Sequence, residues 1–173
     1  MVAVLTAVLL RTFVVETFFI PSGSMIPTLG IGDRILVDRL PFATDHLARG
    51  QVVVFRRVAA DTDPQHPADL VKRVIGLPGE TIWSVGDRIY IDGRPLAEPW
   101  LPSLAKDPPS ALCGQSAYAI PRTTIPKGHY FVMGDCRGNS LDSRSWGTVP
   151  QANVVGEVFV IVWRSGHPWF HWL

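Results

Sequence analysis

The chain has 173 residues, of which 47% are hydrophobic and 18% are charged, and its formal net charge is +1. This apolar content is enough for a sizeable core and argues against disorder, while the near-neutral charge gives no electrostatic footprint for nucleic acid. The 15 glycines and 15 prolines favour short strands and tight turns over a helical bundle. We therefore expect one mostly β domain with a smaller insert.

The first predicted element is an apolar segment at residues 1–19. Arg11 and Glu16 are its charged residues. Its length is close to the roughly 20 residues that a helix needs to cross a bilayer, although the two charges argue against burying all of it in lipid. It has neither the basic start nor the small-x-small cleavage site of a removable signal peptide. We expect the C-terminal part of a transmembrane anchor helix, and a buried N-terminal helix is the alternative.

Short strands are predicted along the rest of the chain. In each, apolar residues either alternate with polar ones or form a short buried run. The predicted strand segments are residues 33–40, 51–58, 70–80, 87–96, 129–135 and 154–163. Within one of them, Asp92 and Gly93 supply a tight hairpin turn. The organisation that follows is a β core from residues 20–80 and 129–173, with residues 81–128 as a smaller and less regular insert.

The loop after the apolar segment, IPSGSMIPTL, contains two candidate nucleophiles, Ser22 and Ser24. Gly, Pro and Ser are also the residues that an ordinary turn uses, so a turn without chemistry is the alternative. A serine hydroxyl is a weak nucleophile and needs a neighbouring base. The five histidines fall in loops, at a strand start and in the C-terminal tail. His167 and His171 are four residues apart but lack further ligands, so we expect no metal site.

Lys72 is the candidate base, because Ser/Lys pairs are an established variant of the catalytic triad. Period-2 alternation places it on one strand face between Leu70 and Val74. Burial among aliphatic side chains disfavours the ammonium form and lowers the pKa of a lysine from about 10.4. Such a lysine can accept a proton near neutral pH. The alternative is a lysine on a solvent-facing edge.

Four sequence blocks carry a resemblance to a known family. They are PSGSMIPTL at 21–29, GDRILVDR at 32–39, VKRVIGLPGE at 71–80 and GDCRGNSLDSRSWGTVP at 134–150. Together, and in this order after an apolar segment, they resemble the bacterial type I signal peptidases. The resemblance implies an all-β fold of antiparallel sheets with a smaller irregular β insert. It also implies an N-terminal membrane anchor and a catalytic domain on the extracytoplasmic face of the cell membrane.

The resemblance also implies roles for individual residues. Ser24 aligns with the nucleophile and Lys72 with the general base. The Ser22 hydroxyl and the backbone N–H of Ser24 align with the oxyanion hole. The implied reaction is attack by the serine, formation of an acyl-enzyme and hydrolysis by water, with no cofactor and no metal.

Three further residues align with a supporting shell: Ser140, Asp142 and Arg144. Ser140 matches a serine that hydrogen-bonds the lysine amine, and the other two match a pair that orders the site. The alternatives are a turn or cap role for Ser140 and Ser22, and an ordinary surface ion pair for Asp142 and Arg144.

The implied substrates are preproteins that carry N-terminal signal peptides, cleaved after small residues in an Ala-x-Ala-like pattern. Shallow apolar pockets would enforce this choice by excluding large side chains. The candidate pocket walls, which flank the dyad in sequence, are Ile20, Met25, Leu29 and Val71. Plain core packing is the alternative for each of them. An extended substrate can add as a strand along an exposed edge.

Cys113 and Cys136 are the two cysteines. In the fourth block, Cys136 stands where the family more usually has asparagine. Because the resemblance places the catalytic face outside the cytoplasm, where disulfides persist, we expect a disulfide that ties the insert to the catalytic loop. Two free buried thiols are the alternative.

The C-terminal tail HPWFHWL is aromatic, with Trp169, Phe170 and Trp172. Aromatic rings favour the membrane–water interface, so one hypothesis is that the tail seats the domain on the lipid bilayer. Packing against the β core is the alternative.

Two other functions compete with the peptidase hypothesis. A self-cleaving Ser/Lys protease of the repressor type would usually carry a helix-turn-helix domain, and no such pattern is present in the sequence. A non-catalytic, membrane-tethered β domain would not need both Ser24 and Lys72.

Overall fold

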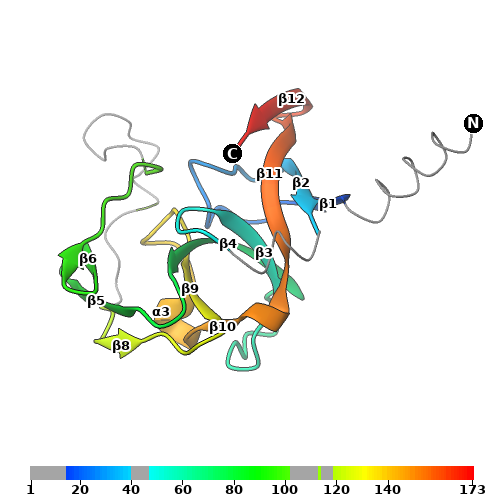
Figure 1. The fold of residues 1–173 in the computed structure, drawn as a ribbon. Helices are drawn as coiled ribbons and strands as arrows, with labels where there is room; N and C mark the ends of the chain where they lie inside the picture. Colours follow the sequence, from blue (N-terminus) through cyan, green and yellow to red (C-terminus); the bar gives the residue numbers. More distant parts are fainter. Residues whose placement is uncertain (1–14, 40–46, 102–112, 114–118) are drawn as a thin grey trace, which may run out of the picture.

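The computed structural model describes residues 15–39, 47–101, 113 and 119–173. Its larger sheet is antiparallel throughout, and Figure 1 shows it strongly curled. The strand order is β1 (Val15–Phe19), β2 (Arg34–Asp38), β11 (Val154–Arg164), β3 (Val52–Arg56), β4 (Asp69–Gly76), β9 (His129–Met133) and β10 (Val149–Pro150). The C-terminal strand β12 (His167–Trp172) pairs with β11 off this path. The prediction of a mostly β, antiparallel fold is confirmed.

A second, four-stranded sheet lies within the predicted insert. Its order is β7 (Arg94–Pro95), β6 (Arg88–Ile91), β5 (Thr81–Val85) and β8 (Thr123–Thr124). The hairpin turn between β6 and β7 uses Asp92 and Gly93 at φ 49° and 84°, as predicted. Figure 1 shows this sheet at the opposite end of the molecule from β11 and β12.

The two sheets share an apolar cluster. Ile82 from β5 packs in the same cluster as Ile75 from β4 and Phe131 from β9. Gly76 ends β4 at this contact, and a Cβ there would lie 2.3 Å from Cδ1 of Ile125. A side chain at position 76 would therefore force the Ile125 side chain, which packs in the shared cluster, to move.

The alternation expected in β4 is present in the structure. Leu70 and Val74 pack in one apolar cluster, whereas Val71 packs against a different one. Lys72 lies between Leu70 and Val74 and pairs with Val53 of β3. The strand therefore has apolar side chains on both faces, and Lys72 is the polar exception on its face.

The expected anchor helix is wrong for residues 15–19, which form strand β1. Phe18 pairs with Ile35 of β2 and packs against the cluster that contains Ile20. Pairing with β2 satisfies the backbone groups on one side of this segment, and this tertiary context outweighs its apolar run. The remainder of the expected helix, residues 1–14, lies outside the described residues. In the described part of the chain, no helix is long and apolar enough to cross a membrane.

Two further segments have regular structure beyond the expected strands. The segment after β9 contains the short helix α3 (Ser143–Trp146), because the Asp142 side chain accepts a hydrogen bond from the backbone N–H of Arg144 and caps the helix. The C-terminal tail forms a strand, β12, which extends the sheet beside β11.

Candidate active site

Ser24 and Lys72 meet at a hydrogen bond. Lys72 Nζ donates to Ser24 Oγ over 2.7 Å. Lys72 comes from the middle of β4, and Ser24 from the loop that joins β1 to β2. The loop is fixed on both sides of Ser24, since Ile20 and Met25 are buried in one apolar cluster. The two side chains, 48 residues apart in sequence, are thus held by a sheet and by a packed loop.

Lys72 is shielded from water, with 5% of its surface exposed. Burial lowers the pKa of Lys72 from 10.5 to about 8. The nearby carboxylates of Asp142 and Asp135 act in the opposite direction, and the Arg144 guanidinium adds to the lowering. Desolvation is the largest effect, so a substantial neutral fraction of the amine is available just above neutral pH.

The backbone around Ser24 is contacted by the segment that follows β9. The Ser24 carbonyl accepts a hydrogen bond from the N–H of Cys136 at 3.1 Å. Gly134 lies so close that a Cβ there would be 2.5 Å from the Ser24 carbonyl oxygen and 2.3 Å from Ser140 Oγ. Glycine is therefore required at position 134 for the loop to approach the candidate nucleophile.

Asp142 is the centre of a buried network beside the dyad. Its Oδ2 accepts from the Gly134 N–H at 2.9 Å, from Ser140 Oγ at 2.8 Å and from Arg144 Nη2 at 2.7 Å. The side chains of Arg144 and Asp142 are 1% and 0% exposed. The alternative of an ordinary surface ion pair is therefore excluded. We expected the Ser140 hydroxyl to bond to Lys72, and in the structure it donates to Asp142.

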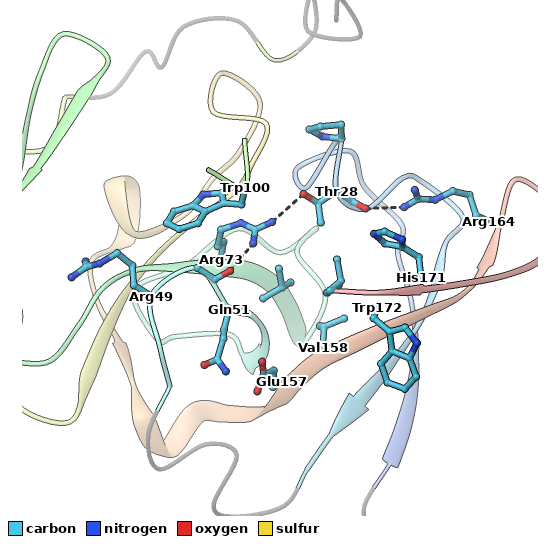
Figure 2. Close-up of a pocket in the computed structure, with 14 residues that line it drawn as sticks. Thr28, Arg49, Gln51, Arg73, Trp100, Glu157, Val158, Arg164, His171 and Trp172 are labelled. Atoms are coloured by element: carbon cyan, nitrogen blue, oxygen red, sulfur yellow. Dashed lines mark hydrogen bonds between the residues drawn. The ribbon is translucent and has the colours of Figure 1, made fainter. Parts of the chain in front are cut away.

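Sequence reasoning missed a second buried ion pair, between Arg73 and Asp135. Arg73 Nε and Nη2 donate to the two carboxylate oxygens over 2.7 and 2.6 Å. The same guanidinium donates to the Thr28 hydroxyl at 3.0 Å and to the Gly50 carbonyl at 2.6 Å, and Figure 2 shows Arg73 pointing toward Thr28. The available signal was the position of Arg73 directly after Lys72, together with the Gly-Asp that opens the fourth block.

A third pair fixes the far end of the loop that carries Ser24. Arg164 Nη2 donates to the Thr28 carbonyl at 2.7 Å and to Asp33 Oδ2 at 2.6 Å. Asp33 in turn accepts from the Gly30 N–H. Asp33 is 1% exposed. Its position in the second sequence block was the only feature of the sequence that pointed to Asp33 as part of the site.

A cavity of about 270 Å³ opens beside the dyad. Both Ser24 and Lys72 line it, and so do three of the four predicted pocket residues, namely Ile20, Met25 and Val71. Leu29 is not among the lining residues, and it is fully buried in the neighbouring core. The lining residues that sequence reasoning missed are Phe18, Phe19, Pro21, Val54, Pro67, Ala68 and Asp69. Ser22 also lines the cavity and is exposed.

A second cavity, of about 580 Å³, shares no lining residue with the first (Figure 2). Three arginines line it, and each is paired with a carboxylate: Arg49 with Glu80, Arg73 with Asp135 and Arg164 with Asp33. Burial raises the pKa of the Glu157 carboxyl in the same cavity. Because none of the three guanidinium groups is unpaired, we assign this cavity no anionic ligand.

The two cysteines form a disulfide between positions 113 and 136. The Trp169–Trp172 part of the tail lies on β12. In the described part of the chain, no cluster of His, Cys, Asp or Glu side chains has an arrangement that could hold a metal ion.

The chain is similar to known proteins over most of its length. The family model described as "Signal peptidase, peptidase S26" matches residues 1–163. Signal peptidase I of Leptolyngbya laminosa is 38% identical over 163 residues, covering 93% of this chain and 75% of that protein. Signal peptidase I T of Bacillus subtilis is 38% identical over 156 residues, covering 90% and 77%.

A crystal structure of a signal peptidase I from Enterococcus faecalis is 33% identical, covers 65% of this chain and 96% of its own, and has a TM-score of 0.48. The family assignment follows from the sequence matches, which extend over nearly the whole chain. The chain belongs to the signal peptidase family, peptidase S26.

Proposed function

We propose that the protein is a serine endopeptidase that removes N-terminal signal peptides from exported preproteins. The observation that carries the proposal is the hydrogen bond of 2.7 Å between Lys72 Nζ and Ser24 Oγ, in a chain of the signal peptidase family. A shielded lysine with a lowered pKa, in contact with a serine hydroxyl, is the arrangement that a Ser/Lys protease needs.

Neutral Lys72 accepts the hydroxyl proton as Ser24 Oγ attacks the scissile carbonyl. The tetrahedral oxyanion is stabilised by the Ser22 hydroxyl and the Ser24 backbone N–H, and each donor of this kind is typically worth about 2.7–4 kcal/mol. The protonated amine then gives its proton to the departing amine of the mature protein. An acyl-enzyme remains on Ser24. Water attacks this ester with Lys72 again as the base, which releases the signal peptide and restores the hydroxyl.

Ser140, Asp142 and Arg144 act through position rather than by contact with substrate. The buried carboxylate of Asp142 fixes the Gly134 backbone and the Ser140 hydroxyl, and Gly134 lies against the Ser24 carbonyl. Arg144 neutralises that carboxylate and donates to the Arg137 carbonyl at 2.8 Å. The three residues keep Ser24 and Lys72 in a geometry ready for reaction.

Catalysis is assigned to residues 20–80 and 129–173, with residues 81–128 as a separate smaller insert, because both dyad residues and their supports lie in the first two segments. The cavity beside the dyad accounts for the choice of small residues. Ile20, Met25 and Val71 give it apolar walls beside Ser24, where small apolar side chains of the substrate can pack.

The direct test uses the full chain in detergent micelles and a peptide whose signal sequence ends in Ala-x-Ala. We expect cleavage after the second alanine, and loss of cleavage in Ser24→Ala and in Lys72→Met. Cleavage that survives either substitution would contradict the dyad. Processing of the chain itself, in place of the peptide, would instead indicate the self-cleaving alternative. No cleavage of either would indicate a non-catalytic domain.

The protein is proposed to lie on the extracytoplasmic face of the cell membrane, with one face of the sheet against lipid. Phe19 on β1 is 60% exposed and Trp172 on β12 is 72% exposed. Trp172 pairs with Val160, Val160 with Leu36, and Leu36 with Thr17. Directly paired side chains share a face, and Thr17 shares its face with Phe19, so both aromatic rings lie on one side of the sheet.

In the sequence, the apolar segment directly precedes the strand that carries Phe19. We propose that the apolar segment and the exposed rings of Phe19 and Trp172 contact the same bilayer at this face. Sedimentation with vesicles of neutral lipid tests the arrangement in a form that begins at residue 15. We expect binding to weaken when residues 169–173 are deleted or when Trp172 is replaced by serine, and unchanged binding would contradict the role of the tail.

A further inference from the structure

We propose that the disulfide between Cys113 and Cys136 is a positioning element for the dyad, so that its reduction slows peptide-bond cleavage. The inference rests on the proposed peptidase function and adds a device that the Ser/Lys reaction itself does not require. Its basis is the contact between Cys136 and the backbone of the nucleophile.

Cys136 is fully buried and touches Ser24 directly. Its backbone N–H donates to the Ser24 carbonyl at 3.1 Å. The sulfur of the same residue is bonded to Cys113, 23 residues earlier in the chain. One residue therefore carries both a covalent cross-link and a hydrogen bond to the nucleophile.

The residues just before Cys136 reach the strand of the base. Asp135 binds Arg73, the residue that follows Lys72, through both carboxylate oxygens. The Gly134 N–H donates to Asp142. Three consecutive residues thus contact the nucleophile loop, the base strand and the buried carboxylate of the supporting network. A shift of this segment changes the relative placement of Ser24 and Lys72.

The disulfide adds a restraint from outside the segment. Residues 134–142 join β9 to α3 without regular structure, and part of what holds them is local, such as the Asn139 N–H on the Cys136 carbonyl at 2.9 Å. The hydrogen bond to Ser24 and the ion pair with Arg73 hold the segment from outside without a covalent bond. The cross-link to Cys113 adds a covalent restraint at the residue that contacts Ser24, with the Cα atoms of the two cysteines 4.5 Å apart.

Loss of the cross-link is expected to lower kcat more than it changes KM. The substrate cavity is lined by β1, β3, β4 and the segments beside them, and neither cysteine contributes to it. The reaction geometry, by contrast, depends on Ser24, and displacements of about 1 Å in such geometry can lower rates by roughly 10²-fold. A partial release of the segment should give a smaller loss, roughly tenfold in kcat.

The experiment compares the oxidised and reduced full chain in detergent micelles on the Ala-x-Ala peptide. Dithiothreitol delivers two electrons and two protons to the disulfide, giving the thiols of Cys113 and Cys136, and leaves as its own cyclic disulfide. Mass spectrometry after alkylation verifies that two thiols have formed. We expect kcat to fall by roughly tenfold with KM nearly unchanged, and to return after reoxidation.

The matched variant is Cys113→Ala, which breaks the cross-link but keeps Cys136 and its N–H. It should show the lower kcat without any reductant, and dithiothreitol should not lower it further. A kcat that is unchanged after verified reduction would overturn the proposal, as would a change confined to KM. Loss of kcat together with loss of the near-ultraviolet circular dichroism would also overturn it, because the disulfide would then serve the fold and not the dyad.

The outcome is separable from that of the proposed function. If the oxidised chain does not cleave the peptide, or cleaves it equally with Ser24→Ala, the peptidase function itself has failed. If the oxidised chain cleaves the peptide in a Ser24-dependent way and its kcat is unchanged by reduction, only the proposed role of the disulfide is contradicted.

Discussion

Arg73 and Asp135 form a buried ion pair directly beside the dyad. Arg73 Nη2 lies 2.6 Å from Asp135 Oδ2, and the two side chains are 7% and 0% exposed. Arg73 follows Lys72 in β4, and Asp135 precedes the residue that donates to Ser24. The pair therefore connects the strand that carries Lys72 to the segment that contacts Ser24. Because the pair is buried, removal of one partner would leave the other charge desolvated and without a counter-ion, which is strongly destabilising.

Substitution of Asp135 by alanine should destabilise the fold strongly. The Arg73 guanidinium would lose its bidentate partner while remaining buried, a change that typically costs about 3–5 kcal/mol. The measurement is the free energy of unfolding in urea. The matched control is Glu16→Gln, which breaks the exposed pair between Glu16 and Arg39 and should cost less than about 1 kcal/mol. Equal effects of the two substitutions would contradict the structural role assigned to Asp135.

The pH dependence of cleavage should report the pKa of Lys72. Burial lowers that pKa to about 8, so the fraction of neutral amine falls about tenfold per pH unit below this value. We expect kcat/KM for the Ala-x-Ala peptide to rise with pH and to level off above about pH 8. An inflection near 6.5 would point to a histidine base, and one near 10.4 to a solvated lysine.

Lys72 should also reduce the stability of the fold at neutral pH. Its pKa is 10.5 in the unfolded chain and about 8 in the folded one, which corresponds to a penalty on the order of 3 kcal/mol. The penalty is fully present below pH 8, where the folded protein holds a buried ammonium. Between pH 8 and 10.5 the unfolded chain binds more protons, so stability rises with pH and the penalty is lost.

Replacement of Lys72 by methionine should therefore stabilise the protein at pH 7 by up to about 3 kcal/mol, and the gain should vanish near pH 10.5. Urea unfolding at several pH values measures both effects. Lys127→Met is the control, because Lys127 is exposed and its replacement should leave stability nearly unchanged. A Lys72→Met variant that is less stable at pH 7 would mean that the amine is not desolvated in solution.

Much of the strand pattern and the dyad could be predicted from the sequence. Strands such as β3 and β4 have apolar sequence patterns that match their burial in the fold. The alternation in β4 was therefore enough to place Lys72 on one face between Leu70 and Val74. The pairing of Lys72 with Ser24 came from recognising sequence blocks, because no local pattern reports a contact across 48 residues.

The predictions that were wrong or missing concern residues whose structure depends on tertiary contacts. Val15–Phe19 is apolar enough for a membrane helix, but pairing with β2 makes it a strand. Leu29 flanks the site in sequence and yet packs in the core. The pair of Arg73 and Asp135 was missed because no local pattern reports a contact between residues 62 apart, and the sequence blocks that contain them were the only signal.

Gly134 should tolerate no side chain, and Gly134→Ala gives the sharpest test of the packing around Ser24. The added Cβ would lie 2.5 Å from the Ser24 carbonyl oxygen, a backbone atom, so the loop must move. We expect kcat on the Ala-x-Ala peptide to fall by one to two orders of magnitude, since displacements of this kind disturb the attack geometry by roughly 10²-fold. Gly30→Ala is the control, because its Cβ would meet Asp33 at an ordinary contact distance of 3.6 Å. Comparable kcat values for the two variants would show that the approach of Gly134 to Ser24 does not set the rate.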